Sequence, residues 1–358
     1  MSKISTKAHD NMRKIMQDVL IALLPVALIS YFAYGAIPWL LIVVAICSAV
    51  ASEFIFSLIY KGEAGSIRDG SSVITAVLLT FTLAPFTPWH VVAFGASMAV
   101  IFGKFLWGGM GKNRLNPALL GREFMTVFFP AVMSSRTIWY DKDLLQFKDL
   151  HLFDFLGQHS ISNILNYLFF NPSGAIGEYS ILFLVLGGLF LLVRKRITWH
   201  IPFGITVTFF VLLFIFQDHN IRFSLGGILL GAIFMATDMP TCAKTKPGKL
   251  FYGAMIASSA ILFLLNDVRY EYMSYSILLL NLFAKTIDNV LKPQEWNSSS
   301  WMKQTGKTLL LTLAILGSAY IVALIHQYIG IRYLLFAFVL YIIYDFIRRM
   351  TSKKVATR

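Results

Sequence analysis

The chain has 358 residues, of which 57% are hydrophobic and only 14% are charged, about half the charged share of an ordinary soluble domain. Its apolar residues form runs long enough to cross a hydrocarbon core of roughly 30 Å, which indicates a membrane protein with many spans and excludes a soluble fold. Its two cysteines, Cys47 and Cys242, exclude a disulfide framework, a zinc ribbon or an iron–sulfur cluster ligated by this chain alone.

Apolar runs between charged or Pro/Gly-rich breaks predict twelve membrane helices, with ends fixed to within a few residues. The first is not a cleavable signal peptide, because no small-residue cleavage site follows it and another span comes next. In chain order, the predicted helices cover residues 15–34, 38–60, 70–86, 89–107, 116–133, 178–193, 199–216, 223–238, 250–265, 272–291, 308–327 and 331–347.

The basic residues predict how the helices are oriented. Counted in alternate connections, 24 of the 31 lysines and arginines lie on one side and six on the other. Because positive residues favour the cytoplasmic side, both termini are predicted to be cytoplasmic. The same asymmetry explains the net charge of +13 by attraction to an anionic leaflet, so nucleic acid is not predicted as a partner.

A weak internal repeat divides the helices. The pattern at Ile67–Ser71, before the third span, returns at Ile221–Ser224, before the eighth. Because an odd number of spans separates them, these two helices run in opposite directions. We therefore expect an all-α polytopic fold, with about ten core helices in two inverted five-helix halves and two extra C-terminal helices. The segments are a cytoplasmic N-terminal segment (1–14), the first half (15–133), an outer-side loop (134–177), the second half (178–291), a cytoplasmic linker (292–307), a two-helix hairpin (308–347) and a basic cytoplasmic tail (348–358).

Polar residues within spans are costly in a bilayer and therefore mark candidate sites. Asp69, Ser71 and Thr75 lie at the start of the third span. Asp69 or Ser71 can simply cap the helix by accepting its free amide hydrogens. Thr75 lies one turn deeper, so we expect it to face a cavity or a neighbouring helix.

A glycine-rich segment precedes the fifth span. Asn113 and Asn116 follow its glycines, and Arg122 lies about a turn and a half into the helix. A helix N-terminus favours an anion such as phosphate, whereas the glycines alone are equally typical of a tight structural turn. Asparagines beside arginines favour contact with a ligand or partner. The segment matches neither the phosphate-loop motif nor the dinucleotide fingerprint.

Other polar residues have two interpretations each. Thr237 and Asp238 end the eighth span, either as part of a site or as a solvated helix end. Glu53, Lys104 and Lys285 are single ionisable residues within spans and candidates for pairing or an ion path. Because Lys104 is near a span end, we expect its amine to snorkel to the interface. We predict no haem ligands, metal cluster or nucleophilic triad.

Five segments, in this order and spacing, resemble the membrane-subunit family that comprises RnfD of the Rnf electron-transport complex and NqrB of the sodium-pumping NADH:quinone oxidoreductase. The resemblance implies ten helices in two inverted halves, a bacterial inner-membrane location and other subunits of a complex as partners. It also implies flavin-mediated electron transfer coupled to Na⁺ or H⁺ movement, by a translocase subunit rather than a free-standing enzyme. The segments are DGSSVITAVLLTFTLAP, GGMGKNRLNPALLGREF, GAIGEYSILFLVLGGLFLLVRKRITWHIP, GGILLGAIFMATDMPT and LLLNLFAKTIDNVLKP.

The chain departs from the family pattern at the flavin attachment site. Members of the family that this chain resembles carry Ser/Thr-Gly-Ala-Thr in the loop before the sixth span. The last threonine of that motif is esterified to the phosphate of FMN. Residues 134–177 lack this motif, and the nearest string ends in Ile176, which has no hydroxyl. We therefore predict that FMN or riboflavin, if bound, is non-covalent, with Thr137 as the fallback acceptor.

The resemblance and the polar segments together predict a flavin site formed by paired half-helix segments. An alternative is a flavin-free channel, transporter or scaffold subunit without redox activity. Asn116-Pro117-Ala118 resembles the helix-capping motif of water channels, and inverted halves also suit solute transport. The candidate flavin-binding residues are Asp69, Ser71, Thr75, Asn113, Asn116, Arg122, Thr237 and Asp238.

Overall fold

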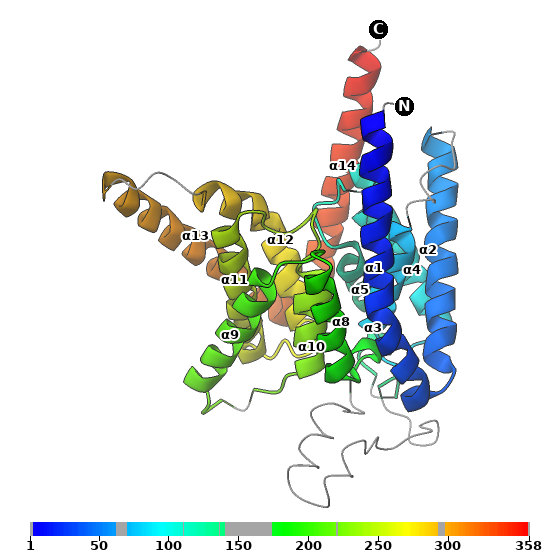
Figure 1. Ribbon diagram of the computed structural model, residues 1–358, viewed down its shortest axis with the longest axis horizontal. Helices are drawn as coiled ribbons and strands as arrows, with labels where there is room; N and C mark the ends of the chain where they lie inside the picture. Colours follow the sequence, from blue (N-terminus) through cyan, green and yellow to red (C-terminus); the bar gives the residue numbers. More distant parts are fainter. Residues whose placement is uncertain are drawn as a thin grey trace, which may run out of the picture.

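The computed structural model describes residues 3–61, 70–109, 111–135, 137–139, 174–219, 221–292 and 298–356, and every regular element in these ranges is helical (Figure 1). The first group is α1 (Lys3–Tyr34), α2 (Ile37–Lys61), α3 (Ser71–Phe81), α4 (Trp89–Gly103), η2 (Phe105–Trp107), α5 (Pro117–Phe128) and α6 (Pro130–Met133). The second is η4 (Ile176–Glu178), α8 (Ile181–Val193), α9 (His200–Ile215), α10 (Leu225–Leu230), η5 (Gly231–Met235), α11 (Lys246–Leu265) and α12 (Tyr272–Val290). The C-terminal elements are α13 (Ser298–Leu324), η6 (Ile325–Ile329) and α14 (Ile331–Ala356).

The two groups pack in corresponding ways. In the first, α2 packs against α3 and α4, and α4 packs against α5; in the second, α9 packs against η5 and α11, and α11 packs against α12. The groups meet where α1 lies antiparallel to α8. Asp18 of α1 pairs with Arg196 beyond the end of α8, while Tyr34 at the end of α1 packs on Tyr179 before α8 begins. This arrangement fits an all-α polytopic protein built from two five-helix halves.

Several apolar helices are too short to cross a bilayer by themselves, and the shortest of those with ten or more residues are α3 and α10 with η5. α3 has 11 residues, which at about 1.5 Å per residue reach half of a roughly 30 Å core, and α10 with η5 is equally short. The predicted spans 70–86 and 223–238 are therefore each a half-helix followed by a loop. Pro85 and Pro88 prevent α3 from continuing. Five helical segments in the described part are long and apolar enough to span: Arg13–Tyr34, Ile37–Ile59, Trp89–Trp107, Lys246–Leu265 and Lys303–Ile329.

Three helices continue past the predicted membrane boundaries. α1 begins at Lys3 instead of residue 15, α13 begins at Ser298 instead of 308, and α14 ends at Ala356 instead of 347. The bilayer limits only the apolar stretch, whereas lysine, arginine and glutamine remain good helix formers in water. Figure 1 shows both chain ends at the same end of the bundle.

The helices α9 and α11 pack closely together, and glycine makes this approach possible. A Cβ atom added at Gly253 would lie 2.6 Å from the carbonyl oxygen of Ile201, and one added at Gly204 would lie 2.8 Å from that of Leu250. Both distances are shorter than a van der Waals contact. Small residues of this kind let membrane helices gain dispersion energy between their backbones.

Candidate functional site

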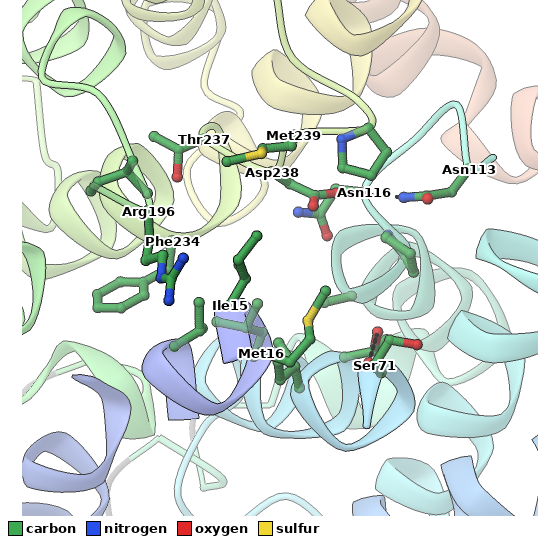
Figure 2. A pocket seen from close by; sticks show the side chains of 18 of the residues that line it. Ile15, Met16, Ser71, Asn113, Asn116, Arg196, Phe234, Thr237, Asp238 and Met239 are labelled. Carbon is green, nitrogen blue, oxygen red and sulfur yellow. Dashed lines mark hydrogen bonds between the residues drawn. The ribbon is translucent and has the colours of Figure 1, made fainter. Parts of the chain in front are cut away.

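A cavity of about 150 Å³ lies between the two helix groups, beside the start of α5 (Figure 2). We call it the inner cavity. Figure 2 shows Asn116, Asp238 and Met239 along one side and Met16 and Ser71 along the other. It is lined by Ile15, Met16, Val19, Ser71, Ile74, Thr75, Leu78, Lys104, Gly111, Asn113, Asn116, Pro117, Ala118, Leu191, Arg196, Ile197, Ile233, Phe234, Thr237, Asp238, Met239 and Pro240.

The structure brings most of the predicted binding residues to this cavity. Arg122 does not reach it and lies at a second cavity, and Asp69 lies outside the described residues. The residues that line the inner cavity come from the start of α3, the loop before α5 and the loop after η5. They are Ser71, Thr75, Asn113, Asn116, Thr237 and Asp238.

Asn116 joins three elements at the cavity wall. Its Oδ1 caps α5 by accepting from the backbone N–H of Leu119 at 3.2 Å, and its Nδ2 donates to the carbonyl of Met235 at 3.2 Å. Its backbone N–H donates to Oδ1 of Asn281 in α12 at 2.9 Å. Asn281 was not among the predicted residues, although an asparagine within an apolar span is a usable signal. These bonds fix the start of α5 against the second half.

Asp238 is held by residues from both halves of the molecule. Its Oδ2 accepts from Nδ2 of Asn113 at 3.4 Å and from the hydroxyl of Thr241 at 3.3 Å. The same loop is fastened to α12, because Asp288 accepts from the backbone N–H of Lys244 at 2.9 Å. The half-buried Asp238 is therefore part of a fixed loop that faces the cavity.

A buried ion pair supports the start of α3. Nζ of Lys104 lies 2.7 Å from Oε1 of Glu53, and both side chains are almost completely buried. Lys104 also donates to Ser71, and the hydroxyl of Ser72 donates to Glu53. Of the alternatives considered for Glu53 and Lys104, pairing is present, and the snorkelling expected of Lys104 is wrong, because Glu53 on α2 offers a partner inside the bundle.

Arg196 is a cavity residue that the sequence analysis did not select. Its Nε lies 2.6 Å from Oδ2 of Asp18, a carboxylate within α1 that is only 5% exposed. Figure 2 shows Arg196 beside Phe234. The usable signal was an acidic residue inside the first span, but its partner is 178 residues away in the chain. The cavity thus includes a cation held in place by a buried acid.

Arg122 lies at a second, outer cavity of about 720 Å³. Its guanidinium donates to the carbonyls of Thr82 and Tyr270, and only 7% of the residue is exposed. This cavity lies where α3 ends and α10 begins, whereas the inner cavity lies where α3 begins and η5 ends. Their placement follows the inverted relation of the two half-helices.

Sequence comparison decides the family. A sequence model of the NQR2, RnfD, RnfE family matches residues 2–297. The chain belongs to this family. Similar members of the NQR2, RnfD, RnfE family are named as subunits of ion-translocating oxidoreductase complexes.

Three relatives illustrate the range of the family. The chain is 33% identical to a subunit of the Na⁺-translocating ferredoxin:NAD⁺ oxidoreductase complex of Acetobacterium woodii, over 83% of this chain and 95% of the relative. It is 31% identical to a subunit of the proton-translocating ferredoxin:NAD⁺ oxidoreductase complex of Clostridium ljungdahlii, over 82% of this chain and 96% of the relative. It is 33% identical to a subunit of the Na⁺-translocating NADH-quinone reductase of Pseudomonas paraeruginosa, over 66% of this chain and 62% of the relative.

Ile176, which replaces the attachment threonine in the nearest string, and the fallback acceptor Thr137 have contrasting surroundings. Ile176 is fully buried, and its backbone N–H donates to the carbonyl of Leu83 at 2.9 Å. Thr137 lies in an exposed turn, where its hydroxyl is 2.7 Å from that of Ser135. Thr137 lines neither cavity. Residues 140–173 of the predicted outer loop lie outside the described residues.

Proposed function

We propose that this protein is a membrane subunit of a complex that couples electron transfer to ion translocation. Family membership supports the proposal, because the relatives named above are subunits of ion-translocating oxidoreductase complexes. Its partners are then the other subunits of such a complex. We place it in the bacterial inner membrane with both termini cytoplasmic, on the strength of the basic residues in alternate connections.

We further propose that the inner cavity binds FMN or riboflavin without a covalent bond. The observation that carries this proposal is the meeting of polar groups from both halves at one cavity that the apolar side chains of Met16, Ile233 and Phe234 also line. A flavin ring has the same division, with a pyrimidine edge that forms hydrogen bonds and an apolar benzenoid edge. The donor set therefore fits the group.

Volume sets a condition on binding. The cavity of about 150 Å³ is smaller than the roughly 300 Å³ at which ligand pockets usually begin. Met16 and Met239 line it, and Met239 is 53% exposed. Methionine side chains are flexible, so we expect these two to move aside when a ring enters.

The protein residues would position the ring and tune its environment. Asn113 can donate to a ring carbonyl, Asp238 can accept from a ring N–H, and Arg196 can stabilise negative charge nearby. A bound flavin would supply the electron chemistry, while the protein controls its position and potential. The coupling ion is not fixed by the family, since one relative is named for Na⁺ and another for protons.

The visible spectrum of the purified intact complex tests the cofactor proposal. We expect flavin absorbance that is released on denaturation, and no fluorescent band for this chain on a denaturing gel under ultraviolet light. A fluorescent band would show a covalent flavin and overturn the non-covalent assignment. A chain without flavin in the intact complex would overturn the flavin proposal.

Substitution of Asp238→Asn tests the inner cavity directly. The amide keeps the shape but cannot act as a charged acceptor, so we expect reduced flavin retention and slower electron transfer through the complex. Asp267→Asn is the matched control, because the side chain of Asp267 is 73% exposed and pairs only with exposed Arg269 among the described ion pairs. Unchanged flavin content and turnover in Asp238→Asn would place Asp238 outside the site.

A flavin-free transporter is the second candidate function. The two cavities are separated by the first turn of α5 and by Met235, since Ala118 lines the inner cavity whereas Leu119 and Met235 line the outer one. Half-helices that meet around a thin barrier are typical of transport proteins. Ion uptake by proteoliposomes containing the colourless complex, without any electron donor, would support this alternative.

A further inference from the structure

The C-terminal helix α14 contacts the loop that supplies Asn113 to the inner cavity. α14 lies beyond residues 2–297, which the family model matches. It packs against α5 and η2, with Ile342 buried among Phe105 and Trp107 and with Leu335 buried beside Phe124. Figure 1 shows α14 rising beside α5 to the end of the bundle where α1 begins. An addition to the family core therefore reaches the neighbourhood of the site.

Arg349 makes the polar part of this contact. Its Nη2 donates to the carbonyl of Leu106 at 2.8 Å and its Nη1 to the carbonyl of Trp107 at 3.1 Å. These are the last carbonyls of η2, immediately before the glycine-rich loop. The guanidinium is oriented by Asp345, 3.0 Å away, which is itself only 7% exposed. Arg349 thus caps the end of η2 with a pair of charge-assisted hydrogen bonds.

A second arginine holds Trp107 from the loop side. The guanidinium carbon of Arg114 lies 5.0 Å from the Trp107 ring centroid and that of Arg349 lies 5.9 Å from it, both distances being suited to cation–π attraction. Nη1 of Arg114 also donates to the hydroxyl of Tyr341 in α14 at 3.4 Å. The loop therefore contacts α14 at two places, through Arg349 where the loop begins and through Arg114 next to Asn113.

Three glycines lie in the loop between these two contacts. Gly108, Gly109 and Gly111 have φ values of 105°, 99° and 76°, which favour glycine. Gly111 and Lys112 are exposed. Glycine also gives an unfolded chain the greatest conformational freedom, so contacts from α14 add to the loop's own backbone hydrogen bonds in holding the form that brings Asn113 to Asp238.

We propose that Arg349 is a positioning residue for the inner cavity, acting through the Leu106 and Trp107 carbonyls to hold the loop that carries Asn113. Together with Trp107 and Arg114 it forms a clasp that fastens α14 over the cavity loop. The ligand that benefits is the one in the proposed function, a non-covalent flavin. Only the flavin part of the test below depends on that function.

Thiol labelling measures the loop directly. Leu115→Cys is introduced into a Cys47→Ser chain, since Leu115 is only 5% exposed beside Leu335 of α14 and the remaining Cys242 is buried, and the detergent-solubilised complex is reacted with a maleimide. Arg349→Gln removes the charged donor, and we expect labelling of the thiol at position 115 to accelerate about tenfold, the effect of losing one hydrogen bond to a charged group. Arg349→Lys should recover part of the protection, because lysine can reach only one carbonyl at a time.

Arg348→Gln is the matched control. Its side chain is 68% exposed, and it pairs with the same carboxylate, Asp345, at a longer distance of 3.8 Å. We expect labelling within about twofold of the parent, as for a weak surface pair. Bound flavin should fall in Arg349→Gln and remain unchanged in Arg348→Gln at equal thermal stability.

The outcomes separate the two proposals. Equal labelling in Arg349→Gln and Arg348→Gln would overturn the clasp, whatever the flavin content. Faster labelling in Arg349→Gln, in a parent complex that never contains flavin, would support the clasp and overturn the flavin proposal. If Arg349→Gln does not assemble, the comparison of Arg349→Lys with the parent decides, and unchanged labelling and flavin content there would overturn the clasp.

Discussion

Single residues at membrane depth are explained by their partners rather than by their position in a span. Glu53 lies on α2 and Lys104 in the turn after α4, yet each side chain offsets the cost of burying the other's charge. Replacing a buried ion pair by apolar groups is often neutral, whereas removing one partner is strongly destabilising, since the remaining charge stays buried. The pair therefore contributes more to the shape of the α2–α3–α4 contact than to net stability.

We predict that Glu53→Gln alone lowers the free energy of unfolding by about 3–5 kcal/mol, because Lys104 is left without a counter-charge. Glu53→Gln with Lys104→Met should recover most of this loss. Denaturant titration of the detergent-solubilised protein measures both values. As a control, Asp267→Asn breaks an exposed pair and should cost less than about 1 kcal/mol. Equal losses in the single and double variants would contradict the assigned role of the pair.

Individual helices are held together by close backbone approach in some places and by polar caps in others. The α9–α11 pair depends on the two glycines that face each other, Gly204 and Gly253. Gly317, in the middle of α13, has nothing within 4 Å of the place where a Cβ atom would be. These positions have the same residue type in long helices but opposite surroundings.

We predict that Gly253→Ala destabilises the protein by about 1–3 kcal/mol, because the added methyl group collides with a backbone carbonyl that can move only with its helix. Gly317→Ala should be neutral or stabilising by up to about 1 kcal/mol, since alanine is the better helix former. Thermal unfolding in detergent compares the two. A stable Gly253→Ala variant would show that α9 and α11 can separate at little cost.

The pattern of apolar runs predicted where the membrane helices lie, but it did not predict where helices such as α3 stop within a span. Apolar runs identified the helices because their length must match the bilayer, but hydropathy carries no information about where backbone bonding stops. The residues between Phe81 and Pro85 contain only one polar side chain, Thr82, although α3 has already ended. Outside the bilayer the error was the opposite, and the predicted helices were too short. Charged residues at the start of α1 continue the helix in water, beyond the apolar run that the prediction used.

The site was predictable where local sequence concentrates polar residues and not where partners are distant. Asn113, Asn116 and Asp238 stand out from their apolar neighbours, and they meet at the inner cavity. Arg196 did not stand out, because it lies in a basic connection and its partner Asp18 is on the first helix. Whether flavin occupies the cavity stays a prediction, since no residue pattern alone specifies a non-covalent ligand.

The whole molecule has its two chain ends at the same end of the bundle (Figure 1). The cavity formed by Asn116 and Asp238 lies on that side of the half-helices, and the cavity formed by Arg122 lies on the other. We propose from the asymmetry of the basic residues that this end faces the cytoplasm. A soluble electron donor or partner domain on that side would approach the inner cavity first.

We predict that epitope tags at both termini are cleaved by added protease in inside-out vesicles and protected in right-side-out vesicles. The reason is the cost of moving the basic connections across the membrane. A tag inserted after Asp218, in the α9–α10 connection, is the control and should behave in the opposite way. Cleavage of only one terminal tag in a given vesicle preparation would contradict the even number of crossings.

The contact between Asp18 and Arg196 also constrains how the protein is made. Asp18 enters the membrane with the first helix, but its arginine is 178 residues later in the chain. At about 5–20 residues synthesised per second, roughly 9–36 s separate the two. During this interval the carboxylate lacks its native counter-charge, so α1 reaches its final depth only after α8 has been inserted. Insertion of α8, at the start of the second half, is therefore the step that supplies this counter-charge to the first half during biogenesis.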